Sequence, residues 1–507
     1  LLAGTDNGLY VYDAERNQIQ HVAHDSRNTY SLSNNIVWTI FRDKEDNIWL
    51  GTDYNISLAR NNKLFRSVPI SEITGVGEGN RFHAIYRDSK KRFWLGGTNG
   101  LIQKETIENK NAVRWFRMGN PQYSISHNRI RQIYEDKDNN IWLATDGSIN
   151  RFDEKTDRFI NYSIIDSTNV YNANWAYDII EDKDGYLWIT CFLGGVFVVD
   201  KQKLIEAKGT YIADRHYTVK DGLSGSHASQ IIEDRNGNKW VLLYNHGINK
   251  IDLKTNKVHR IQLDDATGLN DNPNYILIDK EGDIWAGRRN TLIKIDAETY
   301  ATRKINLDVF GECEVHSMIE SGKNIWLSTS NGILAVDKEN YSIVQRINVS
   351  SNSYTTGFYD KYSGDIYWGA SDEIAILSPA SIDQYTRPNE IVLTSLQING
   401  QPYQQVVNTK SSIRYLDKID LKYKQNNLIF EFSDLIYSQA ESNKFVYRLE
   451  GLDNSNWSTL PANRNRLVFN NLEYGRYSLV ISSLDFSGKP SDNTFTFSIT
   501  INPPWYY

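Results

Sequence analysis

The chain has 507 residues, which is enough for two or three domains with sizeable cores. Its net charge of −6 at pH 7 argues against broad binding to nucleic acid, although it leaves room for a local basic surface. The two cysteines, Cys191 and Cys313, lie in different repeats and have no metal-ligand spacing, so they indicate neither a metal site nor a compartment. No apolar run is long enough to suggest a signal peptide or a membrane span.

The segment from Glu45 to Thr52, EDNIWLGT, occurs again and again along the chain. Its tryptophan, Trp49, recurs at steps of 41 to 52 residues as Trp94, Trp142, Trp188, Trp240, Trp285, Trp326 and Trp368. An aspartate lies six residues before the tryptophan in six of the eight copies: Asp43, Asp88, Asp136, Asp182, Asp234 and Asp279. A period in this range indicates one supersecondary unit that is stacked many times.

Each copy contains short apolar runs separated by turn residues. One run precedes the aspartate, as from Ile36 to Phe41, and a second carries the tryptophan. A third run follows, as from Ile333 to Val336, and several copies add a fourth, as from Arg158 to Ile164. We therefore predict four antiparallel strands per unit, with a tight hairpin turn between the aspartate and the tryptophan.

The tryptophan strands are apolar at consecutive positions, as in Ile48, Trp49 and Leu50, so both of their faces need cover. Small sheets that stack face to face around an axis supply that cover, which predicts an all-β fold with a β-propeller. A solenoid of the same period would need capping units at its ends, and the sequence contains no unit of that kind.

The limits of the repeat predict the domain organisation. Residues 1–62 hold the second half of a unit without its tryptophan strand, followed by the unit of Trp49, so we expect them to be the last blades of a preceding propeller in a longer protein. The Gly-rich segment SEITGVGEGN, at 71–80, marks a boundary. We predict a seven-bladed propeller over 63–385, which closes when residues 63–70 pair with the blade of Trp368.

The repeat stops before Ile391, and alternating runs then predict an immunoglobulin- or fibronectin-like β-sandwich over 386–507. The predicted strands are 391–398, 428–432, 445–449, 466–469, 477–482 and 494–501. The segment from Leu472 to Tyr477 resembles the tyrosine corner of such domains. The last residues, Asn502-Pro-Pro-Trp-Tyr-Tyr507, include aromatics of the type enriched where a chain meets a bilayer.

Together these parts resemble the extracytoplasmic sensor region of hybrid two-component regulators from Bacteroides-type gut bacteria. EDKDGYLWIT, DKEDNIWLGT and GKNIWLSTSNGI resemble the two-component-regulator propeller repeat. Phe445-Val-Tyr-Arg-Leu-Glu-Gly-Leu-Asp453, with Trp457, resembles the triple-tyrosine, or Y_Y_Y, domain. The resemblance implies two propellers before this domain, and a membrane helix, a histidine kinase, a receiver and a DNA-binding module after it. It further implies a periplasmic region of an inner-membrane protein that senses oligosaccharides from polysaccharide breakdown and controls the transcription of glycan-utilisation genes.

Comparison of the units with one another gives candidate ligand-binding residues. Eight residues before each aspartate stands a small polar residue, which we interpret as a structural cap: Asn35, Asn80, Asn128, Asn174, Ser226 and Asp271. The next residue varies, and variable positions on one lip can carry specificity: Arg81, Arg129, Trp175 and His227. The loops between second and third strands should share that face and contribute Tyr244, His246, Arg288 and Arg289. Guanidinium groups match carboxylate or sulfate, and aromatic faces stack on sugar rings, although each residue could also be an ordinary solvated loop residue.

The aspartate turns allow two other interpretations. The turns resemble calcium loops, but the tryptophan strand follows at once and no twelfth-position Glu is present, which favours structural turns. They also resemble the Asp boxes of sialidase propellers, and such an enzyme needs an arginine cluster with a tyrosine nucleophile paired to an acid. Nothing in the sequence marks a set of this kind.

We therefore predict a noncatalytic sensor region without a cofactor or metal. It binds an oligosaccharide, forms a homodimer and joins the inner membrane through a following helix. A propeller lyase or sialidase-like enzyme is the first alternative, and a protein-assembly scaffold is the second. For the repeat itself, we expect Asp136→Ala to cost about 1 kcal/mol, by analogy with the loss of a helix cap.

Overall fold

The structure is a computed structural model of the chain, and it describes residues 1–14, 17–26, 31–43, 46–59, 65–75, 80–107, 112–119, 124–207, 209–263, 272–308, 311–347, 354–380, 390–408, 412–435, 444–452, 456–461, 464–484 and 490–504. Asp271 and Trp505 to Tyr507 lie outside these ranges. The chain divides into two compact units, one of which is Leu64–Gln384 and the other Leu1–Lys63 with Tyr385–Tyr507. The domain limits 1–62, 63–385 and 386–507 stay our proposal.

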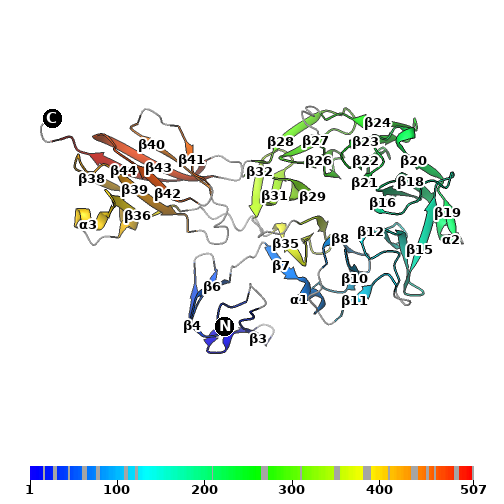
Figure 1. The fold of residues 1–507 in the computed structure, drawn as a ribbon, viewed down its shortest axis with the longest axis horizontal. Helices are drawn as coiled ribbons and strands as arrows, with labels where there is room; N and C mark the ends of the chain where they lie inside the picture. The colour runs from blue at the N-terminus through cyan, green and yellow to red at the C-terminus, as the bar shows by residue number, and fades with distance from the viewer. Residues whose placement is uncertain are drawn as a thin grey trace. The chain divides into compact units, whose positions relative to one another are not determined.

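Seven sheets form the unit Leu64–Gln384, and each holds one tryptophan of the repeat. Figure 1 shows these sheets arranged around a common axis. Their first strands lie side by side in a closed ring of β8, β12, β16, β21, β25, β29 and β33. The seven-bladed propeller predicted from the repeat is thereby confirmed.

The strands of the blades, in chain order, are β8 (Phe82–Arg87), β9 (Phe93–Gly97), β10 (Gly100–Lys104) and β11 (Arg114–Phe116); β12 (Ile130–Glu135), β13 (Ile141–Thr145), β14 (Ser148–Asp153) and β15 (Arg158–Ile165); β16 (Ala176–Glu181), β17 (Tyr186–Cys191), β18 (Gly195–Asp200) and β20 (Arg215–Tyr217); β21 (Ala228–Glu233), β22 (Lys239–Leu243), β23 (Gly247–Asp252) and β24 (Lys257–Ile261); β25 (Tyr275–Ile278), β26 (Ile284–Arg288), β27 (Thr291–Ile295) and β28 (Thr302–Asn306); β29 (Val315–Ser321), β30 (Asn324–Thr329), β31 (Gly332–Asp337) and β32 (Ile343–Ile347); and β33 (Thr356–Tyr359), β34 (Ile366–Gly369) and β35 (Glu373–Leu377). The third blade departs from the pattern, because α2 (Lys201–Glu206), β19 (Thr210–Ile212) and η1 (Val219–Asp221) surround its outer strand. Strand β19 pairs in parallel with β15 of the preceding blade.

The ring closes where a strand from the start of the unit completes the last blade. Strand β7 (Phe65–Pro69) pairs with β35, from Phe65 opposite Leu377 to Pro69 opposite Glu373. Phe65 and Val68 are buried in this sheet, which leaves no open edge between the first and last blades. The pairing predicted for residues 63–70 is thus confirmed, and the short helix α1 (Ile70–Thr74) follows it.

The aspartate and tryptophan contact each other directly in the six repeats that have both. The indole Nε1 of Trp142 donates to Asp136 at 2.8 Å, and the same bond joins Trp94 to Asp88. Four more copies repeat it: Trp49 with Asp43, Trp188 with Asp182, Trp240 with Asp234 and Trp285 with Asp279. The tryptophan side chains of all seven blades are fully buried. The six-residue spacing therefore supplies an acceptor for a buried N–H group, which would otherwise cost free energy.

Two three-stranded sheets precede the propeller. They comprise β1 (Leu2–Thr5), β2 (Gly8–Asp13), β3 (Gln18–Val22), β4 (Val37–Arg42), β5 (Ile48–Thr52) and β6 (Ile56–Ala59). The buried side chains of Leu9, Val37 and Leu50 pack between them. In the isolated chain, β4 leaves Trp38 and Phe41 exposed.

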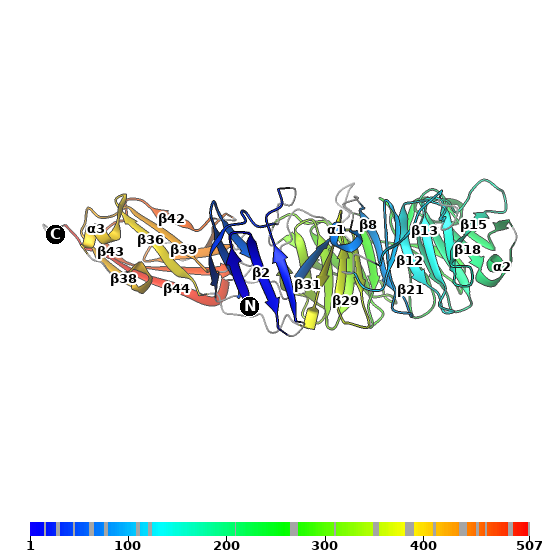
Figure 2. The ribbon, with the colours of Figure 1, turned by 90° about the horizontal axis from the view of Figure 1, so that it is seen from below.

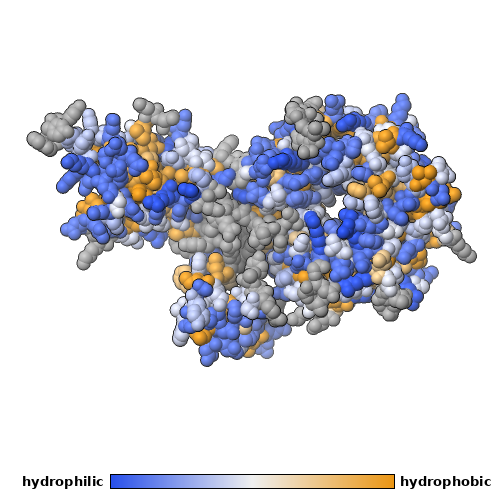
Figure 3. Space-filling model, viewed as in Figure 1, coloured by the Kyte–Doolittle hydropathy of each residue, from blue (hydrophilic) through white to orange (hydrophobic). Residues whose placement is uncertain are grey.

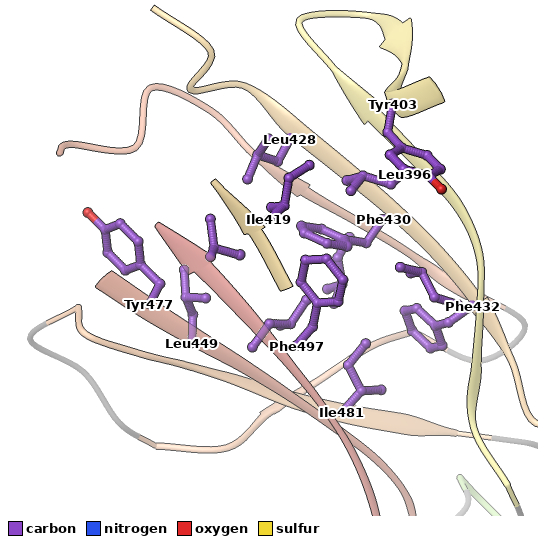
Figure 4. Close-up of a cluster of buried hydrophobic side chains, with 14 of the residues drawn as sticks. Leu396, Tyr403, Ile419, Leu428, Phe430, Phe432, Leu449, Tyr477, Ile481 and Phe497 are labelled. Carbon is purple, nitrogen blue, oxygen red and sulfur yellow. The ribbon is translucent and has the colours of Figure 1, made fainter. Parts of the chain in front are cut away.

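The C-terminal part is a sandwich of two sheets, with strand orders β37-β36-β39-β42 and β38-β44-β43-β40-β41. Its elements are β36 (Val392–Ile398), β37 (Gln401–Pro402), α3 (Tyr403–Val407), η4 (Ile413–Tyr415), β38 (Lys418–Leu421), β39 (Leu428–Ser433), β40 (Phe445–Glu450), β41 (Ser458–Thr459), β42 (Arg466–Phe469), β43 (Gly475–Leu484) and β44 (Pro490–Ile501). Figure 4 shows Leu396, Phe430, Ile481 and Phe497 in its core. The hydroxyl of Tyr477 donates to the carbonyl of Glu473 at 3.0 Å, which is the bond expected of a tyrosine corner.

Seen from the side in Figure 2, the propeller strands run between two opposite faces. The face that carries the aspartate-to-tryptophan turns, between first and second strands, is called the turn rim here. The opposite face is called the bulge rim, for a feature described below. It holds the first residues of the innermost strands and the loops between second and third strands.

Candidate functional site

The candidate residues from the two sets of positions lie against one another on the bulge rim. In five blades, a backbone N–H of the loop between second and third strands donates to the carbonyl of the residue just before the innermost strand. These bonds are Thr98 to Arg81 (3.1 Å), Asp146 to Arg129 (3.3 Å), Phe192 to Trp175 (3.0 Å), Tyr244 to His227 (2.9 Å) and Ser330 to Glu314 (2.9 Å). Strand direction alone predicted this shared face.

The innermost strands begin with a recurring β-bulge. The pairing register slips around one residue in five blades, and these unpaired residues are His83, Arg131, Tyr177, Ser229 and His316. A bulge bends the strand and re-aims the side chain of the extra residue. Because the bulge lies at the second residue of each strand, it re-aims these side chains next to the positions that vary between blades.

Aromatic rings from the third and fourth blades form a continuous row on this rim. The guanidinium of Arg131 lies 4.3 Å from the ring centroid of Tyr177. Tyr177 stacks on Phe192 with ring centroids 5.6 Å apart, and Phe192 stacks on His227 at 4.3 Å with an interplanar angle of 7°. Trp175 contacts Phe192 at 5.6 Å and keeps 45% of its surface exposed. We call Trp175, Tyr177, Phe192 and His227 the aromatic row.

Positive charge gathers beside the aromatic row. Arg131 Nε lies 2.7 Å from Asp146 Oδ1, and Arg129 Nη1 lies 3.3 Å from Oδ2 of the same carboxylate. Burial, followed by the charges of Arg131, Arg81 and Arg129, lowers the pKa of His83 from 6.5 to about 4, although Asp146 opposes this shift. We call Arg81, Arg129 and Arg131 the arginine cluster. It contains three guanidinium groups beside one carboxylate, and the imidazole of His83 is neutral at pH 7.

Trp175 has a backbone conformation that is unusual for a bulky residue. Its φ of 53° lies in the left-handed region. The N–H of Trp175 donates to the carbonyl of Asp146 at 3.1 Å, which ties the residue to the loop of the preceding blade. Strain of this kind costs about 1–3 kcal/mol and gathers at functional sites, so it favours a role for the exposed indole.

The structure places six of the eight predicted residues on this part of the rim and gives the other two different surroundings. Arg81 and Arg129 belong to the arginine cluster, Trp175 and His227 to the aromatic row, and Tyr244 and His246 to the next loop, where His246 Nδ1 lies 2.8 Å from the carbonyl oxygen of Tyr244. Arg288 is expected from sequence to lie in a loop, but it is the last residue of β26 and only 5% exposed. Arg289 pairs with Glu312 at 2.6 Å. A ligand role for these two arginines stays a prediction.

The most informative positions on this rim lie two residues after the variable positions that were predicted from the sequence. His83, Arg131 and Tyr177 each lie five residues before the repeat aspartate, and their identities vary as much as those of the predicted residues. Phe192 was missed because it follows a buried strand directly. Two of the proposed caps act as expected: Asn80 Oδ1 accepts from the N–H of Asn99 at 2.9 Å, and Asn128 Oδ1 accepts from that of Met118 at 2.7 Å.

No group of three or more His, Cys, Asp and Glu side chains within the described ranges is placed to hold a metal ion. The two cysteines are buried free thiols, and burial raises the pKa of both. Figure 3 shows largely hydrophilic residues over the propeller sheets in its view, with hydrophobic residues in small groups. The chemistry of the bulge rim is therefore that of hydrogen-bond donors and stacking surfaces.

Two family models match the chain in the regions where the sequence showed resemblance. The Y_Y_Y domain matches residues 436–502, and the two component regulator propeller matches residues 31–54, 124–147 and 171–192. Among curated proteins, Histidine kinase P4 from Formosa agariphila is 23% identical over 201 residues, which cover 38% of this chain and 14% of that protein. The chain thus spans a small part of this relative's length.

Two solved structures from Bacteroides thetaiotaomicron cover almost the whole chain. The extracellular domain of the putative hybrid two component system BT4673 is 46% identical, with a TM-score of 0.62, and the match covers 99% of this chain and 68% of that one. The extracellular domain of the putative hybrid two component system BT3049 is 21% identical and shows the same fold, with a TM-score of 0.78 over the same shares of both chains. The chain therefore belongs to the family of extracellular sensor domains of hybrid two-component systems, which combine two-component-regulator propeller repeats with a Y_Y_Y domain.

Proposed function

We propose that this sensor region binds oligosaccharides released by polysaccharide breakdown. The observation that carries the proposal is the aromatic row of the bulge rim, flanked by the arginine cluster. Sugar rings present apolar C–H faces and polar edges, so they suit a surface of stacked aromatic rings bordered by hydrogen-bond donors. The strained, half-exposed Trp175 supports the same assignment.

Membership of a sensor family supports the signalling role that we propose. In the proposed receptor, the ligand shifts a two-state arrangement of domains, which requires different affinities for the two states. A periplasmic homodimer would carry the change to a histidine kinase through a following inner-membrane helix, and so control the transcription of glycan-utilisation genes. The helices of the described residues are all too short or too polar to span a bilayer.

The last described residues support a stiff connection. The backbone N–H and the side-chain Nδ2 of Asn502 both donate to the carbonyl of Leu421, at 2.9 Å and 3.0 Å. Pro503 and Pro504 follow and restrict the backbone to extended conformations. A Gly/Ser replacement of residues 502–504 in the full-length receptor should leave ligand affinity nearly unchanged and weaken the transcriptional response. A normal response would rule out rigid transmission through this segment.

The noncatalytic role is also a proposal, because the bulge rim holds arginines, a tyrosine and an acid. A sialidase-type mechanism needs the tyrosine to be activated by a paired carboxylate. In the described structure no hydrogen bond joins Tyr177 to Asp146, and burial raises the pKa of Tyr177, which disfavours a phenolate nucleophile. We therefore favour binding over turnover at this site.

Calorimetry and a turnover assay on the same glycan panel test the proposal. We expect one or more oligosaccharides to bind without being cleaved, and Tyr177→Ala to weaken that binding about tenfold or more through loss of the stacking face. Tyr177→Phe keeps the ring and should preserve affinity. Cleavage that Tyr177→Phe abolishes would establish the enzyme alternative. Binding to a protein partner and to no glycan would favour the assembly scaffold.

A further inference from the structure

Charge is distributed unevenly over the two rims of the propeller. On the turn rim, the buried Lys201 contacts three carboxylates, with Nζ at 3.4 Å from Asp136, 2.6 Å from Asp138 and 2.7 Å from Glu181. On the bulge rim, Arg129 and Arg131 share the single carboxylate of Asp146, and Arg81 acts on the same His83 as these two arginines. Around Lys201 the turn rim thus has one cation and three carboxylates, an excess of two negative charges. The arginine cluster has three cations and one carboxylate, an excess of two positive charges.

The donors of the arginine cluster are used to different extents. Arg131 binds Asp146 through two nitrogens, with Nε at 2.7 Å and Nη2 at 3.2 Å. Arg129 makes one longer contact, at 3.3 Å, and its side chain is 46% exposed. The exposed guanidinium of Arg81 forms no ion pair or hydrogen bond with any side chain in the described ranges. Arg81 and Arg129 therefore retain several donors that Asp146 cannot satisfy.

The arginines lie near enough to one another to act on a common group. His83 lies in the fields of Arg131, Arg81 and Arg129, which together with burial keep its imidazole neutral. Arg81 also lowers the pKa of His316, which burial lowers first and Glu314 opposes. Holding like charges together costs free energy unless an anion offsets the repulsion. The arrangement is therefore suited to a negatively charged partner.

We propose that the ligand is an acidic oligosaccharide, whose carboxylate or sulfate group binds Arg81 and Arg129 while a sugar ring stacks on the aromatic row. This inference rests on the proposed function and adds the class of ligand to it. The two arginines supply the charge-assisted hydrogen bonds, and Arg131, already held by Asp146, fixes the ring of Tyr177 beside them. Recognition of the acidic group and recognition of the sugar ring then belong to different residues, which can be varied separately.

Matched pairs of ligands separate charge from shape. The test is calorimetry on the protein with uronic-acid di- to tetrasaccharides and their neutral methyl esters, with sulfated disaccharides and their desulfated forms, and with neutral oligosaccharides. We expect an acidic member to bind at least about tenfold more tightly than its neutral counterpart, because charge-assisted hydrogen bonds are the strong ones. The uronate and sulfate arms identify which acidic group is recognised.

Substitutions in the arginine cluster provide the second test. Arg81→Gln and Arg129→Gln should each weaken the acidic ligand about tenfold and leave its neutral counterpart nearly unaffected. Arg158→Gln is the matched control, since Arg158 is an exposed arginine on the outer strand β15 of the same blade as Arg129. Circular dichroism and thermal unfolding of each variant establish that it is folded.

Each outcome decides between the two proposals. Binding of neutral oligosaccharides alone, or equal affinity for an acid and its methyl ester, overturns the acidic ligand and leaves the sensing of oligosaccharides intact. Equal losses in the Arg81 and Arg158 variants also overturn it, because general charge would then explain binding. Failure of every acidic and neutral glycan to bind contradicts the proposed function itself.

Discussion

The two rims of the propeller are built from the same seven blades, yet the side chains recur on one rim and vary on the other. On the turn rim the same aspartate recurs, and it accepts the same indole hydrogen bond in five blades, at 2.7 to 3.1 Å. On the bulge rim the same backbone bonds and the same bulge recur, but the side chains at the bulge range from Ser229 to Arg131 and Tyr177.

The difference separates residues that stabilise their own blade from residues that do not. A side chain that satisfies a group inside its own blade repeats with the blade, whereas one that the bulge turns away from its blade is free to change. The last two blades support this interpretation. Trp326 and Trp368 have no aspartate six residues earlier, and no acceptor for the buried indole N–H of either is found in the described structure. Packing of the tryptophan thus outweighs its hydrogen bond in those blades.

The largest expected effect is on packing at the turn rim. Trp142→Ala should lower the free energy of unfolding by about 3–5 kcal/mol, because the ring is fully buried between two blades. Denaturant unfolding of the two proteins measures the difference. If the loss were below about 1 kcal/mol, the tryptophan strands would not form the core of the repeat.

The next effect concerns the acceptor of that indole. Asp136 accepts hydrogen bonds from the Trp142 indole and from the backbone and side chain of Asn140, and it lies beside the buried Lys201. Although burial opposes its ionisation, these donors lower the pKa of Asp136. We therefore expect Asp136→Ala to cost about 3 kcal/mol, more than the 1 kcal/mol suggested by analogy with a helix cap, because several buried donors lose their acceptor.

Asp138 provides the matched control for this measurement. It also binds Lys201, but its side chain is 58% exposed, so Asp138→Ala should cost less than about 1 kcal/mol. Equal losses in the Asp136 and Asp138 variants would show that the ion pair with Lys201 matters more than the tryptophan bond.

A smaller effect is expected on the bulge rim, where the backbone is strained for function. Trp175→Ala and Trp175→Gly both remove the exposed indole, but only glycine adopts a φ of 53° without strain. The glycine variant should be more stable than the alanine variant by about 1 kcal/mol, and both should bind ligand more weakly than the wild type. A more stable alanine variant would mean that the left-handed conformation carries no strain here.

Much of the fold could be predicted from the sequence because the same sequence pattern is repeated in the blades. The spacing of Trp and Asp, the closure by β7 and the tyrosine corner at Tyr477 all follow from local chemistry that the sequence displays. Other elements could not be predicted, and two strands show why. Strand β38 was missed because Lys418–Leu421 is only four residues long, and its partner β44 lies far away in the sequence. Strand β19 was missed because it pairs with a neighbouring blade.

The site was harder to predict than the fold, because a bulge leaves no simple mark in the sequence. The pattern of apolar residues in β12 gives no sign that Arg131 is unpaired, and an arginine there is equally compatible with a regular strand. For Arg288 the prediction of an exposed loop residue was wrong. Its position after a tryptophan strand resembled a loop, but the hairpin of β26 and β27 begins one residue later and buries it.

The smallest expected effect tests whether the arginine cluster carries uncompensated positive charge, which distinguishes it from the excess of carboxylates around Lys201 on the turn rim. Burial is the main cause that lowers the pKa of His83 to about 4, followed by Arg131, Arg81 and Arg129, with Asp146 opposing. Between pH 4 and 6.5 the unfolded chain holds this proton and the folded chain does not, so His83 makes the folded state less stable as the pH falls through that window.

Arg81→Gln should raise the pKa of His83 by less than about one unit, since Arg81 ranks behind burial and Arg131, and a full unit corresponds to about 1.4 kcal/mol. It should also raise the pKa of His316, which is lowered mainly by burial and also by the charge of Arg81. NMR titration of the two imidazoles measures both shifts, and Arg158→Gln should move neither. Unchanged pKa values in the Arg81 variant would mean that solvent already screens this arginine, and the cluster would then carry no uncompensated charge from Arg81.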